Sequence, residues 1–255
     1  PMASGFQKGK DHHLVKNLKA VQDAVLERIK SGYTIQAAMA SENKKADTIR
    51  QWMRRDPDFA KALEEAKEEG TKQTFDALGL TKESIEFSDF SQMFLGQTVF
   101  PHHQDWVDLL EGYEPTWLHP SMIYEPGENN RLLVNVPPEH AKSTVITVNY
   151  STYRIALNPN VRIIVVSKTL NKAREFVYAI KQRLSHPRWL KLQTAYGPDG
   201  GWKEDADTWK ADTVYLGSDA RNSSEKDPTL QALGMGGQIY GARADLIILD
   251  DCITT

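Results

Sequence analysis

The chain has 255 residues, of which 25% are charged and 40% apolar, and its formal net charge is -3 at pH 7. This composition is typical of a globular protein, and it excludes a disordered chain or a polycation that binds nucleic acid over its whole surface. Cys252 is the only cysteine, which excludes internal disulfides, and no apolar run reaches the roughly 18 residues of a membrane span, so we expect a protein of a reducing compartment without membrane contact.

Residues 1–70 predict a small all-α domain. From His13 to Ile29 the apolar residues recur at intervals of three and four, which predicts an amphipathic helix. A short second helix is expected around Ile35, and a third contains Ile49 and Trp52. A fourth helix is expected from Phe59 to about Glu69. Short helices joined by a tight turn and braced by flanking helices correspond to the helix-turn-helix plan.

Hydrogen-bond donors lie on or beside the predicted third helix. In a helix-turn-helix such side chains suit phosphate oxygens and base edges of the DNA major groove. The candidate DNA-binding residues are Lys44, Lys45, Arg50, Gln51, Arg54 and Arg55. The segments from Tyr33 to Ala40, from Asp47 to Trp52 and from Asp56 to Phe59 resemble helix-turn-helix modules of phage-type DNA-binding proteins. The alternative is a helical bundle with ordinary solvated charges.

Residues 71–89 have no strong pattern and are predicted to be a linker to a second domain at residues 90–255. In that domain, apolar strands are predicted from Leu132 to Val136, from Arg162 to Ser167, from Val214 to Gly217 and from Asp245 to Leu249. Helices are predicted from Thr144 to Ala156 and from Asn171 to Leu184. Strands that alternate with helices predict an α/β fold, in which helices cover both faces of a parallel sheet.

The segment from Asn135 to Thr144 lies where the first predicted strand gives way to a helix. Free N–H groups and the positive end of the helix dipole stabilise a phosphate at such a place. As a P-loop, it would use Lys142 for the β and γ phosphates and Ser143 for Mg²⁺. Glycine is expected where this chain has Val136 and Ala141, so a Pro-Pro turn with a solvated lysine is the alternative. The candidate nucleotide-binding residues are Pro137, Pro138, Glu139, His140, Ala141, Lys142, Ser143 and Thr144.

Two carboxylates, Asp250 and Asp251, follow the apolar strand from Leu246 to Leu249. They lie at the carboxyl end of the strand, where parallel sheets place ligands. Asp250 would hold Mg²⁺ together with Ser143, and Asp251 would orient or deprotonate an attacking water. With Lys142, they predict an ATPase that uses ATP and Mg²⁺ and has Lys142 and Asp251 as catalytic residues. The alternative is a strand that ends in two capping acids.

The stretch from Phe90 to Thr255 resembles the ATPase portion of a tailed-phage terminase large subunit. The likeness rests on the Pro-Pro-x-His-x-Lys-Ser loop, on the segment from Ile163 to Ala173 and on the glycine-rich segment from Gly236 to Asp245. It implies a P-loop NTPase sheet of the ASCE type, truncated after the Walker B strand and without the nuclease domain. It also implies that Gln104 contacts the adenine of ATP. We therefore expect an incomplete view of a longer protein.

The same resemblance implies an ATP-hydrolysing motor that translocates double-stranded DNA into a procapsid in the host cell cytoplasm. Its expected partners are double-stranded DNA, the portal of the procapsid and a small terminase subunit, and the active form would be a homo-oligomeric ring. An arginine that stabilises the transferred phosphoryl group would be one of Arg154, Arg174, Arg183, Arg188, Arg221 and Arg243. Two other functions stay open: another P-loop DNA translocase or helicase, and a DNA-binding assembly protein with a degenerate nucleotide site.

Overall fold

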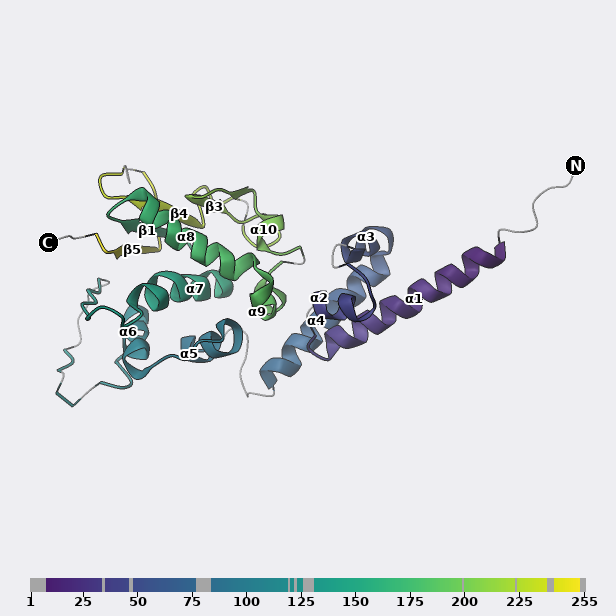
Figure 1. The fold of residues 1–255 in the computed structure, drawn as a ribbon, viewed down its shortest axis with the longest axis horizontal. Coiled ribbons are helices and arrows are strands. Elements are labelled where there is room, and N and C mark those ends of the chain that lie inside the picture. The colour runs from purple at the N-terminus through teal and green to yellow at the C-terminus, as the bar shows by residue number, and fades with distance from the viewer. Residues whose placement is uncertain are drawn as a thin grey trace, which may run out of the picture. The chain divides into compact units, whose positions relative to one another are not determined.

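The computed structural model describes residues 8–33, 35–45, 48–76, 84–118, 120–121, 123–125, 131–198, 200–222, 224–237 and 241–252. The chain divides into two compact units, Pro1–Lys82 and Glu83–Thr255, which Figure 1 colours from purple to blue and from teal to yellow. The predicted linker, residues 71–89, is helical at both ends. Its residues 77–83, and residues 238–240 of the glycine-rich segment, lie outside the described part.

Helices make up the described part of the first unit. They are α1 (Lys8–Lys30), α2 (Ile35–Ser41), α3 (Thr48–Arg55) and α4 (Pro57–Asp76). Their apolar faces meet in one core, formed by Val25, Ile29, Ala38, Met39, Ile49, Trp52, Phe59, Leu63 and Ala66. At the start of α4, the Phe59 N–H donates to Asp56 Oδ1 at 3.0 Å, an N-cap that separates α3 from α4. The predicted all-α N-terminal domain is confirmed.

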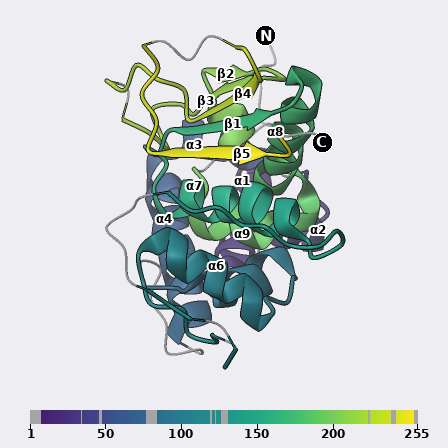
Figure 2. The ribbon, with the colours of Figure 1, turned by 90° about the vertical axis from the view of Figure 1, so that its left-hand side faces the viewer.

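A mixed sheet lies at the centre of the second unit. Its strands are β1 (Ile163–Ser167), β2 (Thr208–Trp209), β3 (Thr213–Tyr215), β4 (Leu230–Gly234) and β5 (Leu246–Asp250). They lie in the order β2-β3-β4-β1-β5. Both neighbours of β1 run parallel to it, whereas β3 is antiparallel to β4 and to β2. Figure 2 shows β5, in yellow, beside β1. Every residue of β1 is buried, as expected for a strand with neighbours on both sides.

The second unit also contains helices. They are α5 (Phe87–Phe90), η1 (Ser91–Leu95), α6 (Pro101–Glu111), η2 (Ser143–Tyr150), α7 (Ser151–Leu157), α8 (Leu170–Ser185), η3 (Pro187–Trp189), α9 (Leu190–Tyr196) and α10 (Trp202–Asp205). α8 packs on β1 and β4, and η2 contacts β5. The wide π-type turns of η2 continue directly into α7. The predicted helix from Thr144 to Ala156 therefore exists, with a different hydrogen-bond pattern in its first half.

The structure corrects two predictions for the sheet. Residues 131–137 form no strand, and the side chain of Leu133 is 90% exposed. An apolar run becomes a strand only where a neighbour accepts its backbone hydrogen bonds, and no described strand pairs with this segment. The sheet is also mixed and not wholly parallel. The second unit is thus shown to be a mixed α/β structure, and the P-loop type of sheet, which needs a strand before the loop, is not shown.

Candidate functional site

α3 has an apolar and a basic face. Ile49 and Trp52 are buried in the core, and the Trp52 ring packs edge-on against Phe59 with centroids 5.5 Å apart. Lys44, Lys45, Gln51, Arg54 and Arg55 are exposed and Arg50 is half-buried. Within the described residues, no ion pair involves Lys44, Lys45, Arg54 or Arg55. The helix therefore presents the guanidinium groups of Arg54 and Arg55 to solvent.

The turn before α3 has a defined geometry. Lys44 N donates to the Met39 carbonyl at 2.9 Å, which closes the end of α2, and Asn43 has a φ of 53°. This is the hydrogen-bond pattern of a Schellman motif, in which asparagine tolerates the left-handed conformation. The Arg28 guanidinium of α1 bonds to Ser41 and to Glu42 Oε1, the latter at 2.5 Å. These bonds tie the end of α2 and the first residue of the turn to α1.

In the second unit, Lys142 lies between the two predicted carboxylates. Its Nζ is 3.2 Å from Asp251 Oδ1 and 3.4 Å from Asp250 Oδ1. Asp250 is only 2% exposed, and its Oδ2 accepts a hydrogen bond of 2.6 Å from the Thr147 hydroxyl. Among the described residues, its Oδ1 has the ion pair with Lys142 as its polar contact. Burial lowers the pKa of Lys142, but the carboxylates of Asp251 and Asp250 outweigh it and the pKa is raised.

The loop before Lys142 has the backbone of a glycine-rich turn. Glu139 and Ala141 have φ angles of 70° and 54°, in the left-handed region that glycine adopts without strain. For other residues this region costs about 1–2 kcal/mol, so the loop is held by its contacts. His103 of α6 provides one. Its Nδ1 accepts from the Phe100 N–H at 3.3 Å, so its Nε2 is the donor to the His140 carbonyl at 3.2 Å.

The other predicted site residues differ in burial and in their partners. Ser143 is half-buried, and Pro137, Pro138, His140 and Thr144 are exposed. It is Thr147, one turn after Ser143, that bonds to Asp250. Sequence reasoning missed Thr147, although its position four residues after Ser143 places both on one face of a helix. Gln104 donates to Asp108 Oδ1 on its own helix at 2.6 Å. The structure thus brings Lys142, Asp250 and Asp251 together and directs Gln104 to another partner.

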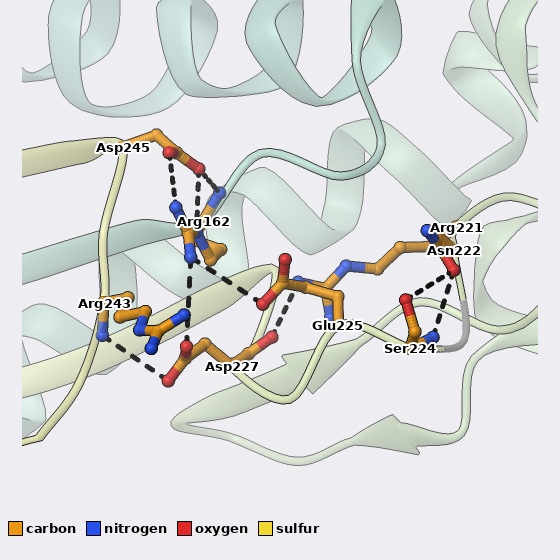
Figure 3. A network of polar contacts seen from close by, with 8 residues as sticks. All are labelled: Arg162, Arg221, Asn222, Ser224, Glu225, Asp227, Arg243 and Asp245. Carbon is orange, nitrogen blue, oxygen red and sulfur yellow. Dashed lines mark hydrogen bonds and ion pairs between the residues drawn. The ribbon is translucent and has the colours of Figure 1, made fainter.

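A separate ionic network surrounds the start of β1 and β5 (Figure 3). Arg162 forms a bidentate pair with Asp245, with Nε–Oδ2 and Nη2–Oδ1 distances of 3.0 and 2.7 Å. Its Nη1 lies 3.7 Å from Glu225 and 3.9 Å from Asp227. The hydrogen bond from Arg162 lowers the pKa of Asp245. The network connects the loop after β3 to the amino ends of β1 and β5, at the opposite end of β5 from Asp250.

Some candidate arginines belong to this network. Arg221 Nη2 donates to the Asp227 carbonyl at 2.6 Å, and Arg243 N donates to Asp227 Oδ1 at 3.4 Å. The remaining candidates contact groups elsewhere, namely Arg154, Arg174, Arg183 and Arg188. Within the described residues, no hydrogen bond or ion pair joins any of these arginines to Lys142, Asp250 or Asp251.

Comparison with protein families matches residues 18–84 to the family described as "Bacteriophage Sf6, terminase small subunit-like". The match covers the helical unit from within α1 to just past the division at Lys82, less than half of the chain. Neither a curated protein nor a solved structure matches the chain. In its described residues, no helix has the length and apolar character needed to cross a bilayer.

This match overturns the resemblance to a terminase large subunit. The family that matches is a small-subunit-like one and not the large ATPase subunit, and the match lies outside the segment that carried the resemblance. The identification as a large subunit was wrong, and so was the assignment of the chain as an ATPase. The resemblance depended on short motifs at a loop and a strand end, and the strand required before the loop is absent from the described sheet.

Proposed function

We propose that the chain is a DNA-binding protein of phage DNA packaging and that its first unit binds double-stranded DNA through α3. The amphipathic character of α3 carries this proposal, because the helix buries Ile49 and Trp52 and presents its basic face to solvent. The match of residues 18–84 to a terminase small subunit-like family supports it. On this proposal the partners are DNA, a terminase large subunit and the portal of a procapsid in the host cytoplasm.

The basic residues divide into two groups by position. Lys44 and Lys45 lie on the turn before α3, and Arg54 and Arg55 end the helix, so these groups would contact phosphates on either side of a groove. Arg50 and Gln51 lie between the two ends of the helix. They would reach base edges, since arginine pairs with guanine and glutamine with adenine. Binding would therefore depend strongly on salt, with a smaller contribution from sequence.

The test compares duplex DNA binding by two full-length double variants, measured by fluorescence anisotropy over a range of salt concentrations. Arg54→Ala/Arg55→Ala should weaken binding and reduce the slope of log K against log salt by about 1–2, since each phosphate contact contributes about 0.9. The matched control is Lys61→Ala/Lys72→Ala, which removes the same charge from exposed positions on α4. If both double variants change the slope equally, α3 is not the DNA-binding element.

The second unit supports a further candidate, a nucleotide-binding site of P-loop type that involves residues 137–144. The observation that favours it is the position of Lys142 between Asp250 and Asp251, beside a loop whose Ala141 is left-handed. An ammonium group suits phosphates, and Mg²⁺ is commonly held by one or two carboxylates together with phosphate oxygens. Asp250 would hold Mg²⁺ with the hydroxyl of Ser143, and Lys142 would hold the phosphates of ATP.

Calorimetry of ATP binding in the presence and absence of Mg²⁺ tests this candidate. Lys142→Ala should weaken binding by roughly tenfold or more, because a charge-assisted hydrogen bond contributes about 1.5–3 kcal/mol. Lys226→Ala removes an exposed lysine between the ionic-network residues Glu225 and Asp227 and should leave binding unchanged. If the parent protein binds no ATP with Mg²⁺ present, the nucleotide candidate is rejected and the α3 proposal is unaffected.

A further inference from the structure

Basic and aromatic residues follow one another where α8 ends and the chain continues through η3 into α9. Figure 1 shows α8 and α9. The residues from Lys181 to Lys191 include no aspartate or glutamate, although the chain as a whole has a net charge of -3. Their basic members are Lys181, Arg183, His186, Arg188 and Lys191. We call the group of Arg183, Arg188, Trp189 and Lys191 the α8-end surface. It belongs neither to α3 nor to the Lys142 site.

Arg183 is a buried cation held by neutral groups. It is 9% exposed, and its Nε donates to Asn149 Oδ1 at 2.7 Å and its Nη1 to the Ala179 carbonyl at 3.2 Å. The Asn149 side-chain amide donates in turn to Gln97, which fixes its orientation. Burial, and then the charge of Arg188, lowers the pKa of Arg183. Arginine keeps its proton in proteins, so this positive charge persists. No ion pair among the described residues joins Arg183 to a carboxylate.

The indole of Trp189 brings a second cation to the same place. The Cζ atoms of Arg183 and Arg188 lie 5.4 and 5.7 Å from the ring centroid, within the range of cation–π contacts. Arg188 is exposed, and its backbone N–H donates to His186 Nδ1 at 3.1 Å, which shapes the turn after α8. Two like charges are therefore held against one ring, where a bound anion would relieve their repulsion.

Stabilisation of the end of α8 explains only part of this arrangement. Basic side chains in the last turn interact favourably with free carbonyl groups, and Arg183 does bond to a carbonyl of its own helix. Arg188 and Lys191 follow the end of α8 and are exposed, so the helix dipole does not account for them. Arginine stacks on aromatic faces and binds phosphates through its planar guanidinium group, so this arrangement suits a phosphate ligand.

We propose that the α8-end surface binds the phosphate backbone of DNA, as a contact separate from that of α3. The inference goes beyond the proposed function, because it places a nucleic-acid contact in the second unit and does not depend on the first. Arg188 and Lys191 contact phosphates directly. Arg183 supplies a fixed positive charge behind them, and Trp189 holds both guanidinium groups in place.

The test uses the full-length chain and duplex DNA, with anisotropy measured across salt concentrations. Arg188→Ala/Lys191→Ala should reduce the slope of log K against log salt by about 1–2 and weaken binding several-fold. The control, Lys172→Ala/Lys226→Ala, removes the same charge from exposed positions of the same unit and should leave the slope unchanged. Arg188→Lys should fall between parent and double variant, since it keeps the charge but loses the planar group.

Separate outcomes distinguish the alternatives. An equal slope for Arg188→Ala/Lys191→Ala and its control overturns this inference, whatever the α3 variants show. Poly-glutamate is a second competitor. If it displaces the labelled DNA as effectively, per charge, as unlabelled DNA does, the surface is a site for acidic polypeptides and the inference is also overturned. If the losses from Arg188→Ala/Lys191→Ala and from Arg54→Ala/Arg55→Ala add, the two DNA contacts are independent. Circular dichroism confirms that the variants fold.

Discussion

Removal of the Lys142 ammonium should destabilise the second unit. The change leaves Asp250, which is 2% exposed, with the hydrogen bond from the Thr147 hydroxyl but without the ammonium group at 3.4 Å. Breaking a fully buried ion pair costs about 3–5 kcal/mol, whereas an exposed pair contributes at most about 1 kcal/mol. The Lys142 side chain is 31% exposed, so Lys142→Ala should lower the free energy of unfolding by about 2 kcal/mol.

A double-mutant cycle measures this effect. Stability is followed by urea unfolding, and hydrogen exchange at the amides of β1 and β5 assigns the change to the second unit. Adding Asp250→Asn to Lys142→Ala removes the uncompensated charge and should recover more than half of the loss. Lys168→Ala, at an exposed position just after β1, is the control. The reasoning is refuted if Lys142→Ala is as stable as the parent, or if the double variant is no more stable than Lys142→Ala.

Three further changes test other parts of the fold. Trp52→Ala should lower the free energy of unfolding of the first unit by about 3–5 kcal/mol, because Trp52 is 6% exposed and its indole packs on Phe59. Urea unfolding measures this loss, and a loss under about 1 kcal/mol would contradict the placement of Trp52 in the core. Gly70→Ala should lower the melting temperature, because the added Cβ would lie 2.1 Å from the Ile29 carbonyl oxygen and push α4 away from α1. An unchanged melting temperature would show that the two helices are not so close. Burial lowers the pKa of His103 in the folded state. The unfolded state therefore binds the proton more readily, and the stability of α6 should fall as pH drops below about 6.5; hydrogen exchange should show that His103→Gln weakens this pH dependence, and an identical profile would exclude His103 as its source.

The first unit could be predicted from the sequence because its signals are local. The intervals of three and four from His13 to Ile29 indicate α1, and the cap at Asp56 marks the start of α4. Each of these signals acts over about one helical turn. Arg54 lies two residues after Trp52, on the opposite side of α3, so its exposure follows from the same periodicity. Arg55 lies three residues after Trp52, on the same side of the helix, and it is exposed at the last position of α3.

The sheet of the second unit was less predictable because strands depend on distant neighbours. The apolar run from Leu132 to Val136 resembles a strand but pairs with nothing in the described sheet. β4 (Leu230–Gly234), which is less apolar, becomes a strand because β1 and β3 accept it between them. The antiparallel pairing of β3 could not be seen from apolar character alone, since parallel and antiparallel strands share it.

The Lys142 site shows why motif geometry does not determine function. A left-handed Ala141 and a lysine between two carboxylates are compatible with a phosphate site, and equally with an ion pair that only stabilises the fold. These alternatives differ in a measurable way. A ligand that binds the folded state raises its stability by RT ln(1 + [L]/Kd). Mg·ATP at about 100 times Kd should therefore stabilise the parent by about 2.7 kcal/mol and leave Lys142→Ala/Asp250→Asn unchanged. If ATP has no effect while the double variant still recovers stability, the lysine and its carboxylates serve the fold alone.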